Sequence, residues 1–331
     1  MATLSGNALT LADWAKRVDP DGKVPMIVEL LSQTNEVLDD MLFVEGNLPT
    51  GHRCSVRTGL PAIAWKLLNQ GVQPSKSVTA QIDEGIGIME AWSEVDKDLA
   101  ELNGNTSEFR LSEAQAFIEA MNQEKSSTLF YGNSSLSPEE FTGLAPRYAD
   151  LSAANAQNII DATGSGSDNT SIWLLCWGAH TVHGIFPKGS KAGLQHMDHG
   201  EVTVETTAGI AGTRLRAYQD QWQWKCGLAL RDWRYAVRIA NIDVSDLVAG
   251  SGADIVELMI KAIHRLPSLN MGKCAFYMNR TVFQYLDIQR RADVATGGMT
   301  FAEVDGKIMY DFRGIPIRKV DALIETEAAV V

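Results

Sequence analysis

Residues 53–100 constrain the fold of this chain most, because they carry a strand pattern that cannot bury itself. Residues 54–57 and 85–92 have strand-like sequences, and glycine, proline and serine interrupt the stretch between them. Arms of about ten residues reach about 33 Å at roughly 3.3 Å per residue. A two-stranded ribbon is marginally stable in water, and its long edges invite pairing. The ribbon therefore lies either on its own body or on a neighbouring chain, and a neighbour would indicate an assembly.

A long amphipathic helix is predicted over residues 111–130. Ser112 followed by Gln115 is a capping-box pattern at its start. Twenty residues span about 30 Å at 1.5 Å per residue. Apolar residues at helical spacing place one stripe on this helix: Ala114, Phe117, Ile118, Met121 and Leu129.

The other predicted elements mix strands and helices. An earlier helix is expected over 26–43, a buried strand over 171–178 with 181–186 as its hairpin partner, helices over 255–266 and 280–291, and a last hairpin from 307–310 and 315–320. The chain shows no internal repeat. Because strands and helices do not alternate as βαβ units, the pattern favours the α+β class.

The charge balance disfavours tight binding to nucleic acid. The 331 residues include 29 basic and 41 acidic side chains, for a net charge of −12, whereas DNA affinity needs clustered lysine and arginine. One stretch, 214–238, is locally basic and rich in aromatic residues. We interpret it as strand with its aromatics on one face and its arginines paired with acidic neighbours. No apolar run approaches the roughly 18 residues of a spanning helix, so we expect no membrane association.

Four histidines form two H-x-x-H pairs, His180 with His183 and His196 with His199, and Cys176 and Asp198 lie nearby. They leave open the alternative of a soluble α+β metal-dependent enzyme. On a strand, however, residues three apart point to opposite faces. We therefore predict no metal site, no catalytic residue and no cofactor. The cysteines (Cys54, Cys176, Cys226 and Cys274) are widely spaced and are expected to be free thiols.

Five segments together resemble the major capsid proteins of short-tailed bacteriophages. The resemblance runs over nearly the whole chain in order and involves 130–148, 177–194 (WGAHTVHGIFPKGSKAGL), 224–243 (WKCGLALRDWRYAVRIANID), 274–280 (CAFYMNR) and 312–324 (FRGIPIRKVDALI). It implies the tailed-phage capsid fold named for phage Hong Kong 97, which has an N-terminal arm, an extended E-loop, a peripheral domain with a long spine helix, and an axial domain.

The resemblance also implies a domain division. The arm would be 1–52 and the E-loop 53–100. The peripheral domain would comprise 101–150, including the spine helix, completed by 201–245 and 308–331. The axial domain would comprise 151–200 and 246–307. Some members of the fold join subunits through a lysine–asparagine bond; Lys66 and Lys76 lie in the E-loop segment, but no matching asparagine can be placed.

The function implied by the resemblance is structural, not enzymatic: a major capsid protein that self-assembles into the icosahedral shell around the double-stranded DNA of a tailed phage. Its partners would be many copies of itself in hexamers and pentamers, with portal, scaffolding and decoration or cement proteins. The packaged DNA would lie close by with weak, non-specific contact. The protein would belong to the virion and be assembled in the host cytoplasm.

Overall fold

The computed structural model describes residues 9, 13, 32–102, 104, 106–205, 213–292, 299–304 and 307–331. The chain forms two compact units. The first contains 1–35, 88–127 and 193–225, and the second contains 36–87, 128–192 and 226–331. No helix among the described residues combines the length and apolar character needed to cross a membrane.

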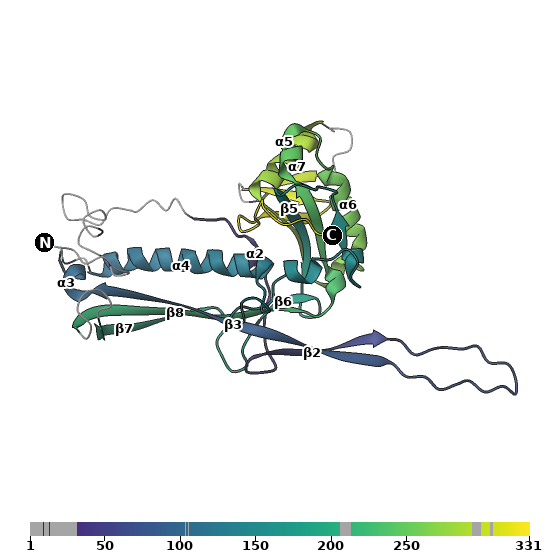
Figure 1. Ribbon diagram of the computed structural model, residues 1–331, viewed down its shortest axis with the longest axis horizontal. Helices are drawn as coiled ribbons and strands as arrows, with labels where there is room; N and C mark the ends of the chain where they lie inside the picture. The colour runs from purple at the N-terminus through teal and green to yellow at the C-terminus, as the bar shows by residue number, and fades with distance from the viewer. Residues whose placement is uncertain are drawn as a thin grey trace. The chain divides into compact units, whose positions relative to one another are not determined.

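The first unit is a helix packed on antiparallel strands. Strand β7 (Leu194–Glu205) pairs with β8 (Arg214–Leu230), and β8 also neighbours β3 (Val78–Asp96). The β7–β8 register shifts between Asp198 and Gly200, where Gly200 has a φ of 67°. A short helix α3 (Lys97–Ala100) precedes α4 (Thr106–Tyr131), which is the longest helix among the described residues (Figure 1).

The prediction of a long helix is confirmed by α4, but its start and its buried stripe are partly wrong. The helix begins at Thr106, so Ser112 lies inside it and donates its hydroxyl to the Phe109 carbonyl instead of capping. Ile118 is 45% exposed. Buried positions recur every four residues along the first unit's part of the helix, with one half-buried member: Phe109, Glu113, Phe117, Met121 and Lys125. With 3.6 residues per turn, this spacing winds the stripe slowly around the helix, as a twisted strand pair requires.

A mixed sheet forms the centre of the second unit. In spatial order its strands are β11 (Met299–Val304), β12 (Lys307–Phe312), β13 (Ile315–Lys319), β10 (Lys273–Met278), β5 (Asn169–Trp177), β9 (Ala236–Asp243) and β4 (Ile159–Asp161). Every residue of β5 is buried, which confirms the predicted buried strand. The β12–β13 hairpin is also confirmed. Parallel and antiparallel pairs with separate helices confirm the α+β class.

The expected hairpin between β5 and the following strand is wrong. Strand β6 (Val182–Phe186) pairs with β5 only at Trp177 and Val182, and in parallel. Instead, β6 runs antiparallel to β8 and parallel to β1 (Phe43–Glu45). The turn before β6 redirects the chain, because the Thr181 hydroxyl donates to the Cys176 carbonyl at 2.6 Å.

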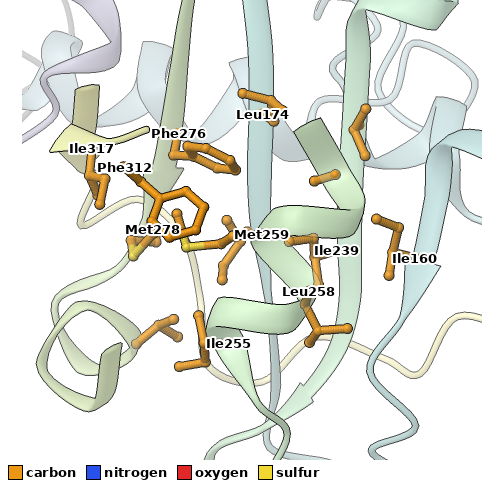
Figure 2. Close-up of a cluster of buried hydrophobic side chains, with 14 of the residues drawn as sticks. Ile160, Leu174, Ile239, Ile255, Leu258, Met259, Phe276, Met278, Phe312 and Ile317 are labelled. Carbon is orange, nitrogen blue, oxygen red and sulfur yellow. The ribbon is translucent and has the colours of Figure 1, made fainter. Parts of the chain in front are cut away.

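Helix α6 (Ile255–Arg265) supplies the apolar layer over this sheet (Figure 2). Its buried face consists of Ile255, Leu258, Met259 and Ala262, which pack with sheet residues such as Leu174, Ile239, Phe276 and Ile317. The Asp254 side chain caps the helix by accepting from the Glu257 amide. This unit also contains the helices α5 (Val244–Ala249) and α7 (Arg280–Ala292), with the 3₁₀ turns η1 (Ala145–Tyr148), η2 (Ala156–Asn158), η3 (Trp233–Tyr235) and η4 (Leu269–Met271).

The segment expected to form an N-terminal arm enters the second unit from residue 36. Within residues 32–52 the structure has one helix, α2 (Val37–Asp40), so the predicted helix over 26–43 is wrong at 32–36 and at 41–43, and 26–31 lie outside the described residues. The helix cannot continue because Phe43–Glu45 extends and pairs with β6. Segment 308–331, expected in the peripheral domain, lies in the second unit, where β13 pairs with β10.

Candidate assembly surface

The predicted ribbon is present as a long antiparallel hairpin of β2 (Gly51–Gly59) and the first half of β3 (Figure 1). The pairing runs from Gly51 opposite Gly85 to Gly59 opposite Val78, with one irregularity after Arg57. Arg53 lies directly opposite Asp83, and its guanidinium donates to both carboxylate oxygens at 2.6 Å. This bidentate salt bridge fixes the register of β2 against β3 on an exposed surface, where side-chain packing cannot fix it.

The hairpin tip is defined here as residues 60–77, and every one of these residues is exposed. A turn shapes its end: the Gln70 amide donates to the Leu67 carbonyl, and Asn69 has a φ of 67°, which asparagine tolerates well. The tip carries a dense set of exposed apolar side chains, of which Trp65 is fully exposed: Leu60, Ile63, Trp65, Leu67, Leu68 and Val72. Exposed apolar sets of this kind mark interaction sites.

The charge of the tip differs in sign from that of the whole chain. Residues 60–77 contain Lys66 and Lys76 and no acidic side chain, whereas the chain carries a net charge of −12. Opposite charges steer association and fix the register of an interface.

Buried polar pairs hold the root of the hairpin. The Glu84 carboxylate, 6% exposed, accepts two hydrogen bonds of 2.6 Å from the Arg147 guanidinium. Arg147 also donates to the carbonyls of Thr142 and Gly143, so four of its five N–H donors have partners. A buried ion pair of this geometry leaves little freedom at the root.

A second set at the root gathers His52, Cys54 and His183 around Arg231. The Arg231 guanidinium lies 3.1 Å from His52 Nε2 and donates to the Cys54 thiol at 3.4 Å. The rings of His52 and His183 meet edge to face, 5.8 Å apart. Desolvation, reinforced by the charge of Arg231, lowers the pKa of His183 to about 4 and also lowers the pKa of His52. Both histidines are therefore neutral near pH 7.

In the first unit, α4 is held to β8 by three aromatic contacts. Phe117 stacks on Trp222, with ring centroids 5.1 Å apart. The Lys125 ammonium lies 3.2 Å from the Trp224 ring centroid, and the Arg110 guanidinium lies 5.0 Å from that of Tyr218. These residues of β8 are spaced by two or four, so they share one face of the strand.

These contacts partly confirm the interpretation of residues 214–238, which placed the aromatic residues on one face and paired the arginines with acidic neighbours. Tyr218, Trp222 and Trp224 do share a face. The arginines pair with acidic side chains at Arg216–Glu201, Arg234–Asp232 and Arg238–Glu327. The prediction that 214–238 forms one strand is wrong, because the chain turns through η3 between β8 and β9.

The four histidines do not face one another within either pair. His183 is fully buried in β6, whereas His180 is exposed in the preceding turn. On β7, His196 Nε2 bonds to Asp220 Oδ1 at 2.9 Å, and its ring stacks on Trp222.

His199 belongs to the other side of that sheet. Its Nε2 bonds to the Gln221 side chain at 3.0 Å, and its ring stacks on Trp92. In the described part of the chain, no three histidine, cysteine or acidic side chains are arranged to hold a metal. Cys176 lies on β5 opposite Cys274 of β10, and Asp198 bonds to Arg110.

Two buried ionic networks were not foreseen from the sequence. Glu327 near the C-terminus accepts from Arg238 at 2.7 Å and from the Tyr131 hydroxyl at 2.5 Å, and it also bonds to Ser171. Arg238 and Glu327 are 4% and 5% exposed. Their separation by 89 residues explains why no spacing rule could find the pair.

The other network centres on Asp40, whose side chain is 2% exposed. The Asp40 carboxylate accepts hydrogen bonds from Lys273 at 2.5 Å, from Arg318 at 3.1 Å and from the Tyr277 hydroxyl at 3.0 Å. Burial is the main cause that raises the pKa of Tyr277, and the nearby Asp40 charge adds to it. The network fastens the end of α2 to β10 and β13.

Comparison with known proteins gives matches over nearly the whole chain. The family model described as major capsid protein GP7 matches residues 19–331. The cryo-EM structure of bacteriophage Epsilon15 superposes with a TM-score of 0.80 and 33% identity, covering 100% of this chain and 99% of that one. No curated protein sequence matches.

Two further solved structures are similar at low identity. The capsid of bacteriophage JBD30 matches at 9% identity and a TM-score of 0.45, covering 89% of this chain and 92% of that one. The capsid of a native GTA particle also matches at 9% identity and a TM-score of 0.45, covering 68% and 95%.

Proposed function

The chain belongs to the family of major capsid proteins described as GP7, and we propose that its hairpin tip is the contact through which one copy binds the next in the shell. Its role as a structural protein of a phage capsid follows from the family and from the Epsilon15 likeness. The tip supplies what a shell subunit needs: a surface that becomes buried only on a neighbour.

The observation that carries this proposal is the exposure of Trp65, whose side chain has no cover from its own chain. Burying such a ring on a neighbour removes apolar area from water at about 25 cal/mol per Å². The hairpin root is rigid because Glu84 and Arg147 fix it, so less ordering entropy opposes the contact.

The test replaces Trp65 with aspartate and compares it with Gln73→Asp, which adds the same charge to the same tip without removing an apolar ring. Circular dichroism checks that both variants keep the wild-type fold. We expect Trp65→Asp to lose most of the assembled fraction in sedimentation, and Gln73→Asp to keep most of it. Equal assembly by Trp65→Asp and wild type would refute the role of the tip.

The division into named capsid domains is likewise a proposal. We assign the first unit, which holds residues 106–127 of α4, to the peripheral domain and the hairpin of β2 and β3 to the E-loop. The unit with the mixed sheet around β5 becomes the axial domain. Support comes from the long helix and from the independent core of each unit. Amide hydrogen exchange that gives each unit its own opening free energy would support the division, and one value shared by both units would contradict it.

Partners beyond the chain itself also belong to this proposal. We propose portal, scaffolding and decoration proteins as partners, and hexamers and pentamers assembled in the host cytoplasm. The acidic net charge supports a packaged DNA that lies near the shell without binding it tightly. Co-purification of the expressed chain with candidate phage proteins, at varied salt, tests each partner.

A further inference from the structure

We propose that Cys176 and Cys274 form a modification site: a buried pair of thiols that a low-molecular-weight disulfide oxidises to a bridge between β5 and β10. Nothing in the capsid role requires this pair. The inference rests on the placement of the two residues in the central sheet.

The two cysteines stand directly opposite each other in an antiparallel pair of strands. The register runs from Lys273 opposite Trp177 through this pair to Tyr277 opposite Trp173. Directly opposite residues in such strands have Cα atoms about 4.5–5.5 Å apart. A disulfide accepts Cα separations of about 4.4–6.8 Å. The backbone therefore already has the spacing that a bridge needs.

The thiols themselves interact inside the core. Cys176 is fully buried and Cys274 is 9% exposed. The neighbouring Cys176 thiol and burial raise the pKa of Cys274, whereas the Cys274 thiol lowers the pKa of Cys176. The Cys274 thiol also donates to the Leu269 carbonyl at 3.6 Å. Because both thiols are buried, a disulfide reagent reaches them slowly, and the pair stays reduced in a reducing compartment.

The remaining cysteines have different surroundings. Cys54 lies opposite Ile82 in the β2–β3 ribbon, and its thiol accepts from Arg231. Cys226 lies on β8. They therefore serve as internal controls of the same residue type within the same unit.

The reaction consumes one oxidant disulfide. Cys274, the more exposed of the two, loses its proton to solvent and attacks one sulfur of the oxidant. This breaks the oxidant's S–S bond, forms a mixed disulfide and releases one thiolate. Cys176 then loses its proton and attacks the Cys274 sulfur, which forms the protein bridge and releases the second thiolate. Both leaving thiolates take up protons, so two electrons and two protons pass from protein to oxidant.

The bridge would restrain the unfolded chain more than the folded one. It joins positions almost a hundred residues apart in sequence, so it closes a long loop that includes β6, β8, β9 and α6. Cross-links that close long loops remove the most entropy from the unfolded state. The folded strands are already paired, so the native sheet needs little adjustment.

The experiment treats the wild-type chain with 2,2′-dithiodipyridine, alkylates the remaining thiols, and digests the protein without reductant for mass spectrometry. We expect a peptide pair joined through Cys176 and Cys274, two hydrogens lighter than the reduced sum and absent after dithiothreitol. We also expect a higher melting temperature for the oxidised protein, reversed by the same reductant. Cys54→Ala and Cys226→Ala should keep the bridge, and Cys176→Ser should lose it.

Several outcomes overturn the proposal. Recovery of both cysteines as alkylated thiols, or as separate mixed disulfides with the reagent, shows that the sulfurs cannot meet. A bridge to Cys54 or Cys226 shows that the site is elsewhere, and an unchanged melting temperature removes the stabilising role. The peptide map uses the wild-type chain, so a folding defect in a serine variant does not change its result.

Discussion

Phe117 of α4 stacks on Trp222 of β8, with ring centroids 5.1 Å apart and ring planes 9° from parallel. The next residue, Ile118, is 45% exposed. Phe117 therefore lies on the packed face of the helix and Ile118 on its exposed face, although both side chains are large and apolar.

Phe117→Ala should destabilise the first unit by about 2–3 kcal/mol, because it removes a half-buried ring and a stacking contact. Ile118→Ala should lower the free energy of unfolding by only about 0.5–1 kcal/mol, because an exposed side chain loses little packing. Urea denaturation of the unassembled chain, followed by circular dichroism, measures both. Equal losses would mean that Ile118 is covered as well as Phe117.

Glu327→Gln should destabilise the second unit by about 3–5 kcal/mol, because it leaves the buried Arg238 charge without its partner. The matched control is Glu257→Gln, which breaks an exposed pair with Lys261 on α6, at 2.6 Å. That change should cost at most about 0.5 kcal/mol. A Glu327→Gln variant as stable as the control would show that the C-terminal tail does not hold the core.

Asp40→Asn should also destabilise the second unit, by about 2–4 kcal/mol, because Lys273 and Arg318 lose their shared carboxylate. Asp39→Asn is the control, because the Asp39 side chain, which neighbours Asp40 in α2, is exposed. Thermal melting of the two variants gives the comparison. If both melt together, the end of α2 is not fastened by this network.

Acid should weaken the second unit through His183. Its folded pKa of about 4 lies below the ordinary value of 6.5, so the unfolded chain takes up the proton first as the pH falls. Its contribution is complete above pH 6.5 and is lost progressively toward pH 4. Around His183, the charges of Arg231, His52 and His180 all oppose protonation.

The measurement is the free energy of unfolding from about pH 7 to about pH 4 for the wild type and for His183→Gln, which cannot titrate. We expect a shallower decline in the variant. His180→Gln, which alters the exposed member of the pair, should keep most of the wild-type slope. Parallel curves for the wild type and His183→Gln would assign the acid sensitivity to other groups.

The elements with strong periodicity could be predicted, and the contacts between distant segments could not. The long helix and the buried run of β5 follow from local pattern and appear as expected. The stripe on α4 was misplaced because its buried positions include Glu113 and Lys125, whose burial depends on the partner strand. No rule based on local sequence predicts the burial of a charged side chain against a partner strand.

The hairpin and its surroundings show the same limit. An unburied ribbon over residues 53–100 could be predicted from its two strand-like segments and from the glycine, proline and serine between them. The root could not, because Glu84 and Arg147 are 63 residues apart and meet only in the folded unit. Strand β6 was misassigned because a close sequence neighbour usually pairs first, whereas here a tight turn at Thr181 sends it to β8.

The most direct test of the assembly role is negative-stain electron microscopy of the purified full-length chain, with sedimentation of the same sample. A capsid subunit that joins its neighbours through an exposed apolar hairpin should form closed shells or curved sheets of shell curvature. A chain that stays monomeric, or stops at a small oligomer across the accessible concentration range with and without co-expressed phage proteins, would contradict it.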